Sequence, residues 1–214
     1  MKKIGIFDDI KRLFKINIIN YDGFNEVYDE EGNLIKKFSK NSGKKHGVYN
    51  EWYSNSQERK IMNFVHGVLE GEMKEWYETG QLKSKKTFTN GVISSIQKEW
   101  YENGKLKLEG VNRCNDYVDD RGFTKIYDFK YQGISKEYHQ NGQLMEIGVY
   151  NDNEQVGVWK TYHENGQLQS ITEYCNNEEI GVTKRFYKNG NLLSEKWNSK
   201  NDNEVLNYKK YYFE

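Results

Sequence analysis

The chain has 214 residues, of which 36% are hydrophobic and 30% are charged, and its mean hydropathy is −1.01. This composition argues against one thick hydrophobic core, whereas an aromatic content of 15% argues against intrinsic disorder. Basic and acidic residues both number 32, so the formal net charge is zero and no overall field favours nucleic acid. We therefore expect a thin structure that buries aromatic side chains and has no nucleic-acid partner.

Residues 1–20 contain apolar side chains at a helical spacing. These are Ile6, Phe7, Ile10, Leu13 and Phe14. Charged residues interrupt the apolar run, so it resembles neither a secretory signal nor a membrane span, and we expect a cytoplasmic protein of bacterial type. A short amphipathic helix at this end would cap a repeat array, or it would dock on a membrane or a partner.

Residues 21–214 repeat with a period of 24 residues. An Asn-Gly turn or a close substitute anchors each unit, at Gly32, Ser56, Gly80, Gly104, Gly142, Gly166 and Gly190. An aromatic residue precedes each anchor by four positions, and a leucine follows all but one of them by two. A second glycine lies nine residues before most anchors, at Gly23, Gly47, Gly71, Gly133, Gly157 and Gly181. Seven units in register predict a repeat array.

Each unit has two short runs rich in β-branched and aromatic residues, joined by the Asn-Gly turn. This pattern predicts a β-hairpin with a two-residue type I′ turn. We therefore predict an all-β fold, an elongated array of stacked antiparallel β-hairpins preceded by the short N-terminal helix. With Asn103 and Gly104 as the loop residues, Tyr101 would pair with Leu106, and Trp100 would pair with Lys107.

This register predicts two different faces of the sheet. The leucines would share the drier face with the residues three positions before the anchors, Tyr53, Tyr77, Tyr101, His139, His163 and Tyr187. The opposite face would hold an aromatic stripe among charged side chains, formed by Trp52, Trp76, Trp100, Tyr138, Tyr162 and Phe186. The stripe is either a surface that binds a partner or structural packing in a thin sheet.

The array is interrupted once, because Gly104 and Gly142 are 38 residues apart. A 14-residue insertion therefore lies within residues 109–133. Its centre provides further candidate binding residues, Asp116, Tyr117, Asp119, Asp120 and Arg121. The acidic run lacks the alternating ligands and terminal glutamate of a calcium-binding EF-hand loop, and the segment is more typical of one extra hairpin. An insertion can nevertheless give one repeat protein its own specificity.

The sequence offers no complete set of metal ligands and no catalytic constellation. His139 and His163 occupy the repeat position of tyrosines, so we expect them to replace an aromatic packing residue. Cys114 and Cys175 have no metal or redox spacing and are expected to be free thiols. We predict no catalytic residue, no cofactor and no metal.

The units Gly71-EMKEWYETGQL and Gly157-VWKTYHENGQL resemble the MORN-repeat variant of bacterial antitoxin-like proteins, and the resemblance extends over about residues 23–192. It implies an elongated sheet of stacked hairpins with a binding or scaffolding role, in some members as the antitoxin beside a toxin. It implies no catalytic residues. Some phosphatidylinositol phosphate kinases contain such repeats beside a catalytic domain, but this sequence lacks the phosphate-binding loop and metal-binding aspartate motif of a kinase.

We therefore expect a non-enzymatic protein-interaction module, an antitoxin-like or immunity-like binder of one protein partner such as a toxin. Two other classes stay open: a membrane- or ligand-binding repeat module for phosphoinositide, choline or glycan, and a structural scaffold that self-associates. Choline-binding repeats share the aromatic hairpins, but they have a different period and a secretion signal that does not occur here.

Overall fold

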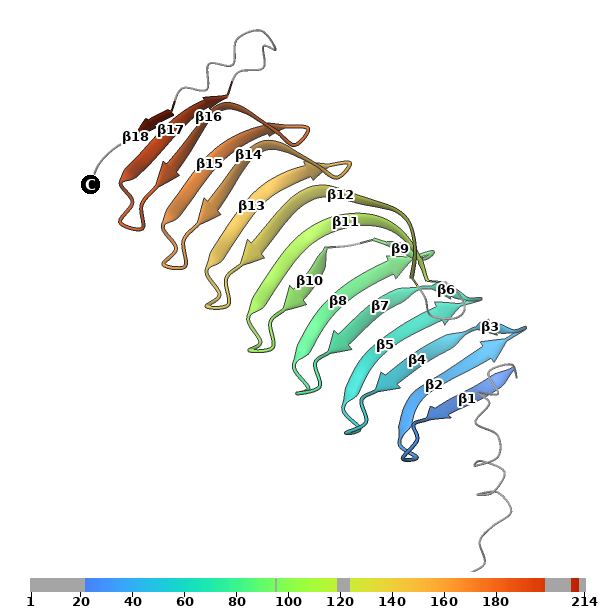
Figure 1. The fold of residues 1–214 in the computed structure, drawn as a ribbon. Helices are drawn as coiled ribbons and strands as arrows, with labels where there is room; N and C mark the ends of the chain where they lie inside the picture. Colours follow the sequence, from blue (N-terminus) through green and yellow to red (C-terminus); the bar gives the residue numbers. More distant parts are fainter. Residues whose placement is uncertain (1–21, 95, 119–123, 199–208, 212–214) are drawn as a thin grey trace, which may run out of the picture.

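A computed structural model describes residues 22–94, 96–118, 124–198 and 209–211. The described chain is all-β and forms a single antiparallel sheet (Figure 1). The predicted N-terminal helix lies outside the described residues, as do Asp119, Asp120 and Arg121 of the insertion. No helix of the described part is long and apolar enough to cross a membrane.

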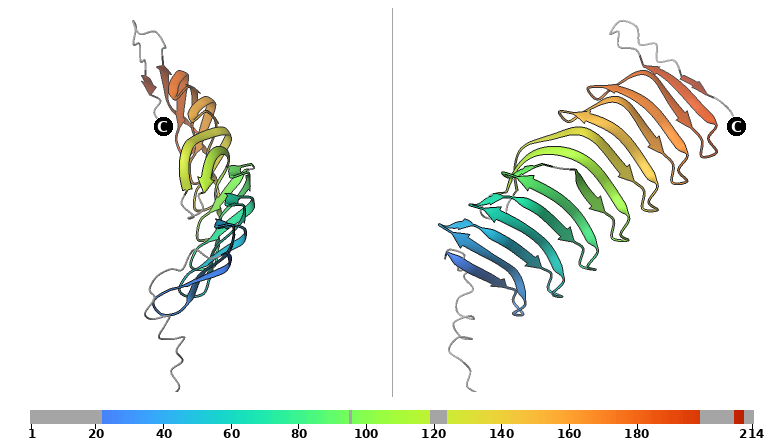
Figure 2. Two further views of the ribbon diagram at one scale, coloured as in Figure 1. Left: turned by 90° about the vertical axis from the view of Figure 1, so that its right-hand side faces the viewer. Right: turned by 180° about the vertical axis from the view of Figure 1, so that it is seen from behind.

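Successive strands lie side by side across the sheet in chain order. They are β1 Gly23–Tyr28, β2 Leu34–Asn41, β3 Lys44–Lys45, β4 Gly47–Trp52, β5 Glu58–Val65, β6 Val68–Leu69, β7 Gly71–Trp76, β8 Leu82–Thr89, β9 Val92–Ile93, β10 Gln97–Trp100, β11 Leu106–Val118, β12 Thr124–Tyr138, β13 Leu144–Asn151, β14 Glu154–Tyr162, β15 Leu168–Cys175, β16 Glu178–Phe186, β17 Leu192–Asn198 and β18 Lys209–Tyr211. The short strands β3, β6 and β9 pair with the far ends of β2, β5 and β8. Seen from the side, the sheet is one layer thick and twists along its length (Figure 2).

The turns at the hairpin tips differ from the predicted type I′ turns. The amide of Gly104 donates to the carbonyl of Tyr101 at 2.9 Å, and the amide of Tyr101 donates to the carbonyl of Lys105 at 2.8 Å. Gly104 has a φ of 81°, whereas the φ of Asn103 is not positive. The loop is therefore a type I turn followed by one left-handed glycine, which makes it one residue longer than we predicted.

The longer loop changes which residues face each other. Trp100 lies opposite Leu106, and a β-bulge follows at Lys107, because Glu99 pairs with Leu108. All seven hairpins show the same shift. The prediction that the aromatic stripe and the leucine row lie on opposite faces is therefore wrong. They share one face of the sheet, which we call the outer face.

Type I′ turns occur instead at the opposite ends of the strands, far from the hairpin tips, where one hairpin leads into the next. Two consecutive residues with positive φ form each turn, at Ser42-Gly43, His66-Gly67, Asn90-Gly91, Asp152-Asn153 and Asn176-Asn177. Beyond these turns the second glycines also have positive φ, for example 85° at Gly47 and 67° at Gly157. At Gly157, residues 157–159 of β14 face the single residue Gly148 of β13. These bulges bend the strands.

Side chains at the hairpin tips connect each unit to the next one. The Tyr/His row donates to backbone carbonyls of the following unit, in the pairs Tyr53–Trp76 (2.9 Å), Tyr77–Trp100 (2.9 Å), Tyr101–Tyr138 (2.7 Å), His139–Tyr162 (2.8 Å) and His163–Phe186 (3.0 Å). Because a carbonyl oxygen only accepts, Nε2 of each histidine must hold the proton. The histidines thus replace a tyrosine donor as well as an aromatic packing residue.

Asparagines directly before the anchor residues form a second set of such bonds. Their Nδ2 groups donate to carbonyls of the following tip, in the pairs Asn55–Glu78, Asn103–Gln140, Asn141–Glu164 and Asn165–Lys188. The Oδ1 atom of Asn103 meanwhile accepts from the amide of Lys105 within its own loop, at 3.0 Å. One asparagine therefore both stabilises its own turn and binds the neighbouring unit.

The hydrophobic core lies on the opposite face, which we call the core face, in the N-terminal half of the array. It consists of Phe38, Tyr49, Met62, Phe64, Leu69, Phe88 and Ile93. Buried Lys45 occupies the repeat position of Leu69 and Ile93, and its Nζ lies 4.4 Å from the ring centroid of Tyr49 and 5.2 Å from that of Phe64. The aromatic rings stabilise its cationic group. A drier face exists as predicted, but the leucine row does not form it.

The insertion extends one connection instead of adding a separate unit. It lengthens β11 to 13 residues and β12 to 15, and their pairing continues as far as Val118 and Thr124. The predicted hairpin is therefore present, but it is continuous with two strands of the array. Strand β11 lies against β9 and β6, which contain the core residues Ile93 and Leu69 (Figure 1).

Replacing Tyr101 by phenylalanine should lower the free energy of unfolding by about 1 kcal/mol, because the partly buried carbonyl of Tyr138 loses its donor. Tyr28→Phe is the matched control, since the Tyr28 hydroxyl bonds to Glu26 at an exposed site where water can replace it. Urea unfolding would measure both variants. Equal stability of Tyr101→Phe and wild type would contradict this role of the Tyr/His row.

Candidate binding face

The aromatic stripe lies on the outer face, at one repeat position on alternate strands. Each of its six members is half-buried. Trp76, Trp100 and Tyr162 lie opposite Leu82, Leu106 and Leu168. Each of these three rings therefore lies beside a leucine of the same hairpin, whereas Trp52 lies opposite Glu58, and the exposed part of each ring is open to a partner.

A second row of apolar side chains on the outer face is more exposed than the stripe. It follows the second glycine of most units and consists of Phe24, Val48, Ile96, Ile134 and Val158, with exposed fractions from 50% to 85%. We call it the post-glycine row, and it was not predicted from the sequence. One feature of the sequence could have revealed this row. An apolar residue directly follows the second glycine, or Ser95 in its place, in every unit except the one with Glu72.

Lysines form a third row on the outer face, six residues before the anchors. Most of them are neutralised by a glutamate on the same face, as in Lys74–Glu72 (2.5 Å), Lys98–Glu109 (3.0 Å), Lys136–Glu109 (3.8 Å) and Lys184–Glu195 (3.2 Å). The exception is Lys160, which is exposed and makes no ion pair within the described residues. Its strand neighbours at the same level are Ile147 and Ile171.

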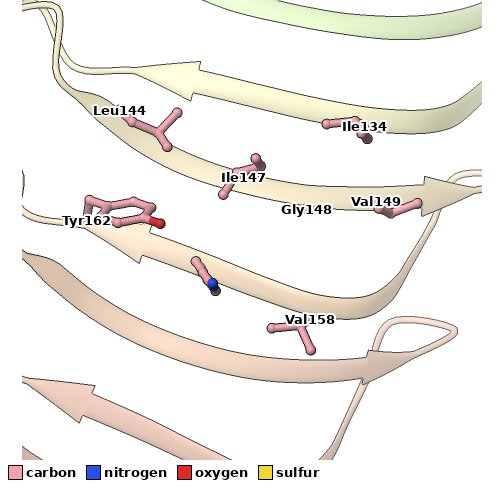
Figure 3. A pocket seen from close by; sticks show the side chains of 8 residues that line it. Ile134, Leu144, Ile147, Gly148, Val149, Val158 and Tyr162 are labelled. Carbon is pink, nitrogen blue, oxygen red and sulfur yellow. The ribbon is translucent and has the colours of Figure 1, made fainter.

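Lys160 is one of the residues that line an apolar groove of about 500 Å³. Figure 3 shows the groove and labels its other lining residues. Strands β12, β13 and β14 supply its lining, which comprises Ile134, Leu144, Ile147, Gly148, Val149, Val158, Lys160 and Tyr162. Tyr162 belongs to the aromatic stripe, and Ile134 and Val158 belong to the post-glycine row. Leu144 belongs to the leucine row, so the groove is the place where all four rows of the outer face meet.

Gly148 forms the floor of the groove because Trp159 packs against it from the core face. A Cβ atom at residue 148 would lie 2.0 Å from the indole ring. The ring is buried and lies edge-on to Tyr150 and Tyr174, with centroids 4.9 and 6.3 Å away. Nε1 of Trp159 has no hydrogen-bond partner among the described residues. On the core face beneath the groove, the side chain of Trp159 thus has the role that a cluster of several residues has in the N-terminal half.

Two carboxylates lie directly opposite each other on the core face beneath the groove. Glu146 of β13 pairs in register with Glu137 of β12. Burial, and secondarily the charge of Glu137, raise the pKa of Glu146 above its usual value. Glu75 shows the opposite balance: burial would raise its pKa, but the ion pair with Lys60 and a hydrogen bond from Ser84 outweigh burial and lower it.

The residues predicted in the insertion are only partly placed. Asp116 and Tyr117 lie on β11, opposite Ile126 and Lys125 of β12. Asp119, Asp120 and Arg121 lie outside the described residues. Asp116 and Tyr117 lie on the far part of β11, whereas the stripe residues lie next to the hairpin tips. The stripe and the insertion are therefore separate candidate sites.

The remaining polar candidates do not form a ligand set. The rings of His46 and His66 lie 5.0 Å apart, and Nδ1 of His46 accepts from the amide of His66 at 3.3 Å. Among the described residues, no three His, Cys, Asp or Glu side chains are grouped so that they could hold a metal ion. Cys175 is half-buried and does not form a disulfide.

The family model of the MORN repeat variant matches residues 69–90, 95–115, 131–152, 155–176 and 179–201, which is more than half of the chain. The chain belongs to the MORN repeat variant family. MORN repeats commonly serve as binding modules for proteins or membranes. No curated protein matches the chain.

The MORN matches leave out the parts in which this chain departs from the repeat. The two units anchored at Gly32 and Ser56 precede the first match, and residues 116–130 lie between the second and third. Both omitted units still form hairpins with the same register shift. Ser56 adopts the left-handed conformation of the missing glycine, with a φ of 67°. The structure therefore extends the array beyond the five matched MORN repeats.

Replacing Gly148 by alanine should destabilise the array by about 1–3 kcal/mol, because the new methyl group overlaps the buried ring of Trp159. Gly110→Ala is the control: the nearest atoms to its Cβ would lie 3.4–3.5 Å away, and its φ is not positive. Urea unfolding followed by tryptophan fluorescence would compare them. Equal losses in both variants would contradict the packing described.

Replacing Glu146 by glutamine should stabilise the protein at neutral pH by up to about 1 kcal/mol, since two like charges no longer face each other. A raised pKa means that the folded state holds the proton more tightly. Wild-type stability therefore falls as pH rises through the interval between the usual and the raised pKa. The advantage of the variant should disappear at acid pH, where Glu146 is protonated in both states.

Glu75→Gln is the matched control with the opposite sign. The lowered pKa of Glu75 means that its ionised form stabilises the folded state above its usual pKa and loses this effect as pH falls. This variant should destabilise the protein at neutral pH and less at acid pH. Urea unfolding at several pH values would test both, and equal signs at neutral pH would refute the assignment.

Proposed function

We propose that the protein is a non-enzymatic interaction module that binds one protein partner through its outer face. The observation that supports this best is the post-glycine row, because it leaves apolar side chains at least half exposed in five of seven units. Exposed apolar surface of this extent is typical of surfaces that bind another molecule. The half-buried rings of the aromatic stripe, on the same face, are of the type enriched at interface centres.

We propose further that the partner relationship is of the antitoxin or immunity type, in the cytoplasm of a bacterium. The resemblance of the repeats to antitoxin-like proteins supports this version. A rigid array with locally varied side chains suits recognition of one partner better than catalysis. Catalysis would need several polar groups converging on one pocket, whereas the groove described above is lined almost entirely by apolar side chains.

Two alternatives predict different behaviour. A ligand- or membrane-binding module would be stabilised thermally by phosphoinositide, choline or glycan. A scaffold would self-associate, for example by pairing at the edge strand β1, where Phe24 is 85% exposed. The protein-binding proposal requires neither property.

The proposal can be tested by purifying the tagged full-length protein from its native host and identifying retained proteins by mass spectrometry. We expect one partner at near-equal stoichiometry, and we expect Trp76→Ala/Trp100→Ala to weaken its retention. Glu102→Ala is the control, because it changes an exposed tip residue away from the stripe. Each variant would first be checked by urea unfolding, so that lost binding is not confused with lost folding.

Other results separate the two candidate sites. Retention that survives the stripe variant but disappears when residues 111–127 are excised would move the site to the insertion. Recovery of no partner, together with thermal stabilisation by phosphoinositide, choline or glycan, would overturn the protein-binding proposal.

A further inference from the structure

Lys160 is distinguished from its repeat equivalents by its neighbours. At its level on the outer face, residues of seven successive strands follow in the order Glu109, Lys136, Ile147, Lys160, Ile171, Lys184 and Glu195. The outer glutamates neutralise Lys136 and Lys184. Isoleucines occupy both positions beside Lys160, so its positive charge has no counterion among the residues that the structure describes.

The nearest carboxylate on the adjacent strand does not fill this role. Glu173 of β15 lies opposite Val158, one pleat away from Lys160, and forms no ion pair with it. Val158 and Tyr162 flank Lys160 along β14, and Ile147 and Ile171 flank it across the sheet. One unpaired cation is therefore surrounded on four sides by apolar groups.

A ligand for this surface needs one anionic group with apolar groups around it. Side chains two residues apart on β14 are about 6.6 Å apart, and the same spacing separates alternate side chains of any extended peptide. A peptide that lies on the groove along β14 can thus place an acidic side chain over Lys160 and aliphatic side chains beside Val158 and Tyr162. The groove volume of about 500 Å³ is sufficient for a few side chains.

The charge pattern disfavours an anionic membrane as the occupant. Attraction to acidic lipids requires a cluster of about four to eight uncompensated basic residues. In this row Lys74, Lys98, Lys136 and Lys184 are all ion-paired, and the net charge of the protein is zero. A single free cation in an apolar groove matches a single carboxylate instead.

We infer that the groove around Lys160 binds an extended segment of the partner protein with the pattern aliphatic–any–acidic–any–aliphatic, whose carboxylate pairs with the Lys160 ammonium. This inference rests on the proposed protein-binding function and specifies its location and its partner chemistry. Burial of the ion pair by aliphatic side chains excludes water and strengthens the attraction. The chain thereby acquires specificity at a position where the other four lysines of the row form internal ion pairs.

The test is selection of a display library of short random peptides against the full-length protein, followed by affinity measurement of the selected peptides. We expect the consensus to contain one Asp or Glu between aliphatic residues. Lys160→Gln should weaken binding by about 10-fold or more. Lys74→Gln, at the same repeat position outside the groove, should leave it unchanged. Exchanging the acidic residue of the peptide for its amide should cost about as much, with little additional loss in Lys160→Gln.

A consensus without an acidic residue, or affinities that do not depend on Lys160, would overturn the inference. Three further assays identify other occupants, each of which would also overturn it: Lys160-dependent binding to phosphatidylserine vesicles, Lys160-dependent dimerisation in light scattering, and displacement of selected peptides by a synthetic peptide of residues 1–20. Because Lys160 is exposed and makes no ion pair in the described part of the chain, its replacement should not affect folding. If a native partner is retained and Lys160→Gln does not weaken it, the groove inference fails while the proposed function stands.

Discussion

The hydrogen bond from a tip side chain to a backbone carbonyl of the next unit is the constraint on which the array depends. Successive hairpins pair only partly through their backbones: β2 and β4 share the pairs Lys36–Glu51 and Lys37–Asn50 and no others. Toward the tips the strands diverge, and their carbonyls need donors from elsewhere. Tyrosine and histidine both supply a hydrogen-bond donor at the same repeat position, which explains why either residue type can occur there.

The repeat, the hairpins, the all-β class and the place of the insertion follow from the sequence, because glycines, asparagines and aromatic residues recur in a fixed register. The turn type does not follow, since Asn-Gly suits either a two-residue type I′ loop or the last two positions of the longer loop found here. The difference of one residue reverses which side chains share a face. The leucines therefore lie on the outer face and not in the core, and each pairs across the hairpin with an aromatic residue, as Leu106 does with Trp100.

The groove could not be predicted for a related reason. Lys160 has the same repeat position as four other lysines, and its sequence neighbours do not set it apart. Its individuality comes from Ile147 and Ile171, which become its neighbours only once the register between strands is known. Similarly, the post-glycine row is exposed because each of its residues precedes a core-face residue on the same strand, as Val48 precedes Tyr49 and Val158 precedes Trp159, which hydrophobicity alone would not indicate.

The long hairpin of β11 and β12 has a consequence for cooperativity. In a linear array each unit contacts only its neighbours, so its stability is a sum of unit and nearest-neighbour terms, and unfolding can begin anywhere along the chain. Strand β11 breaks this rule, because it lies against both β9 and the more distant β6. The units around it are thereby joined into one block, whereas the C-terminal units keep the independence of a simple array, and the two parts should open as separate foldons.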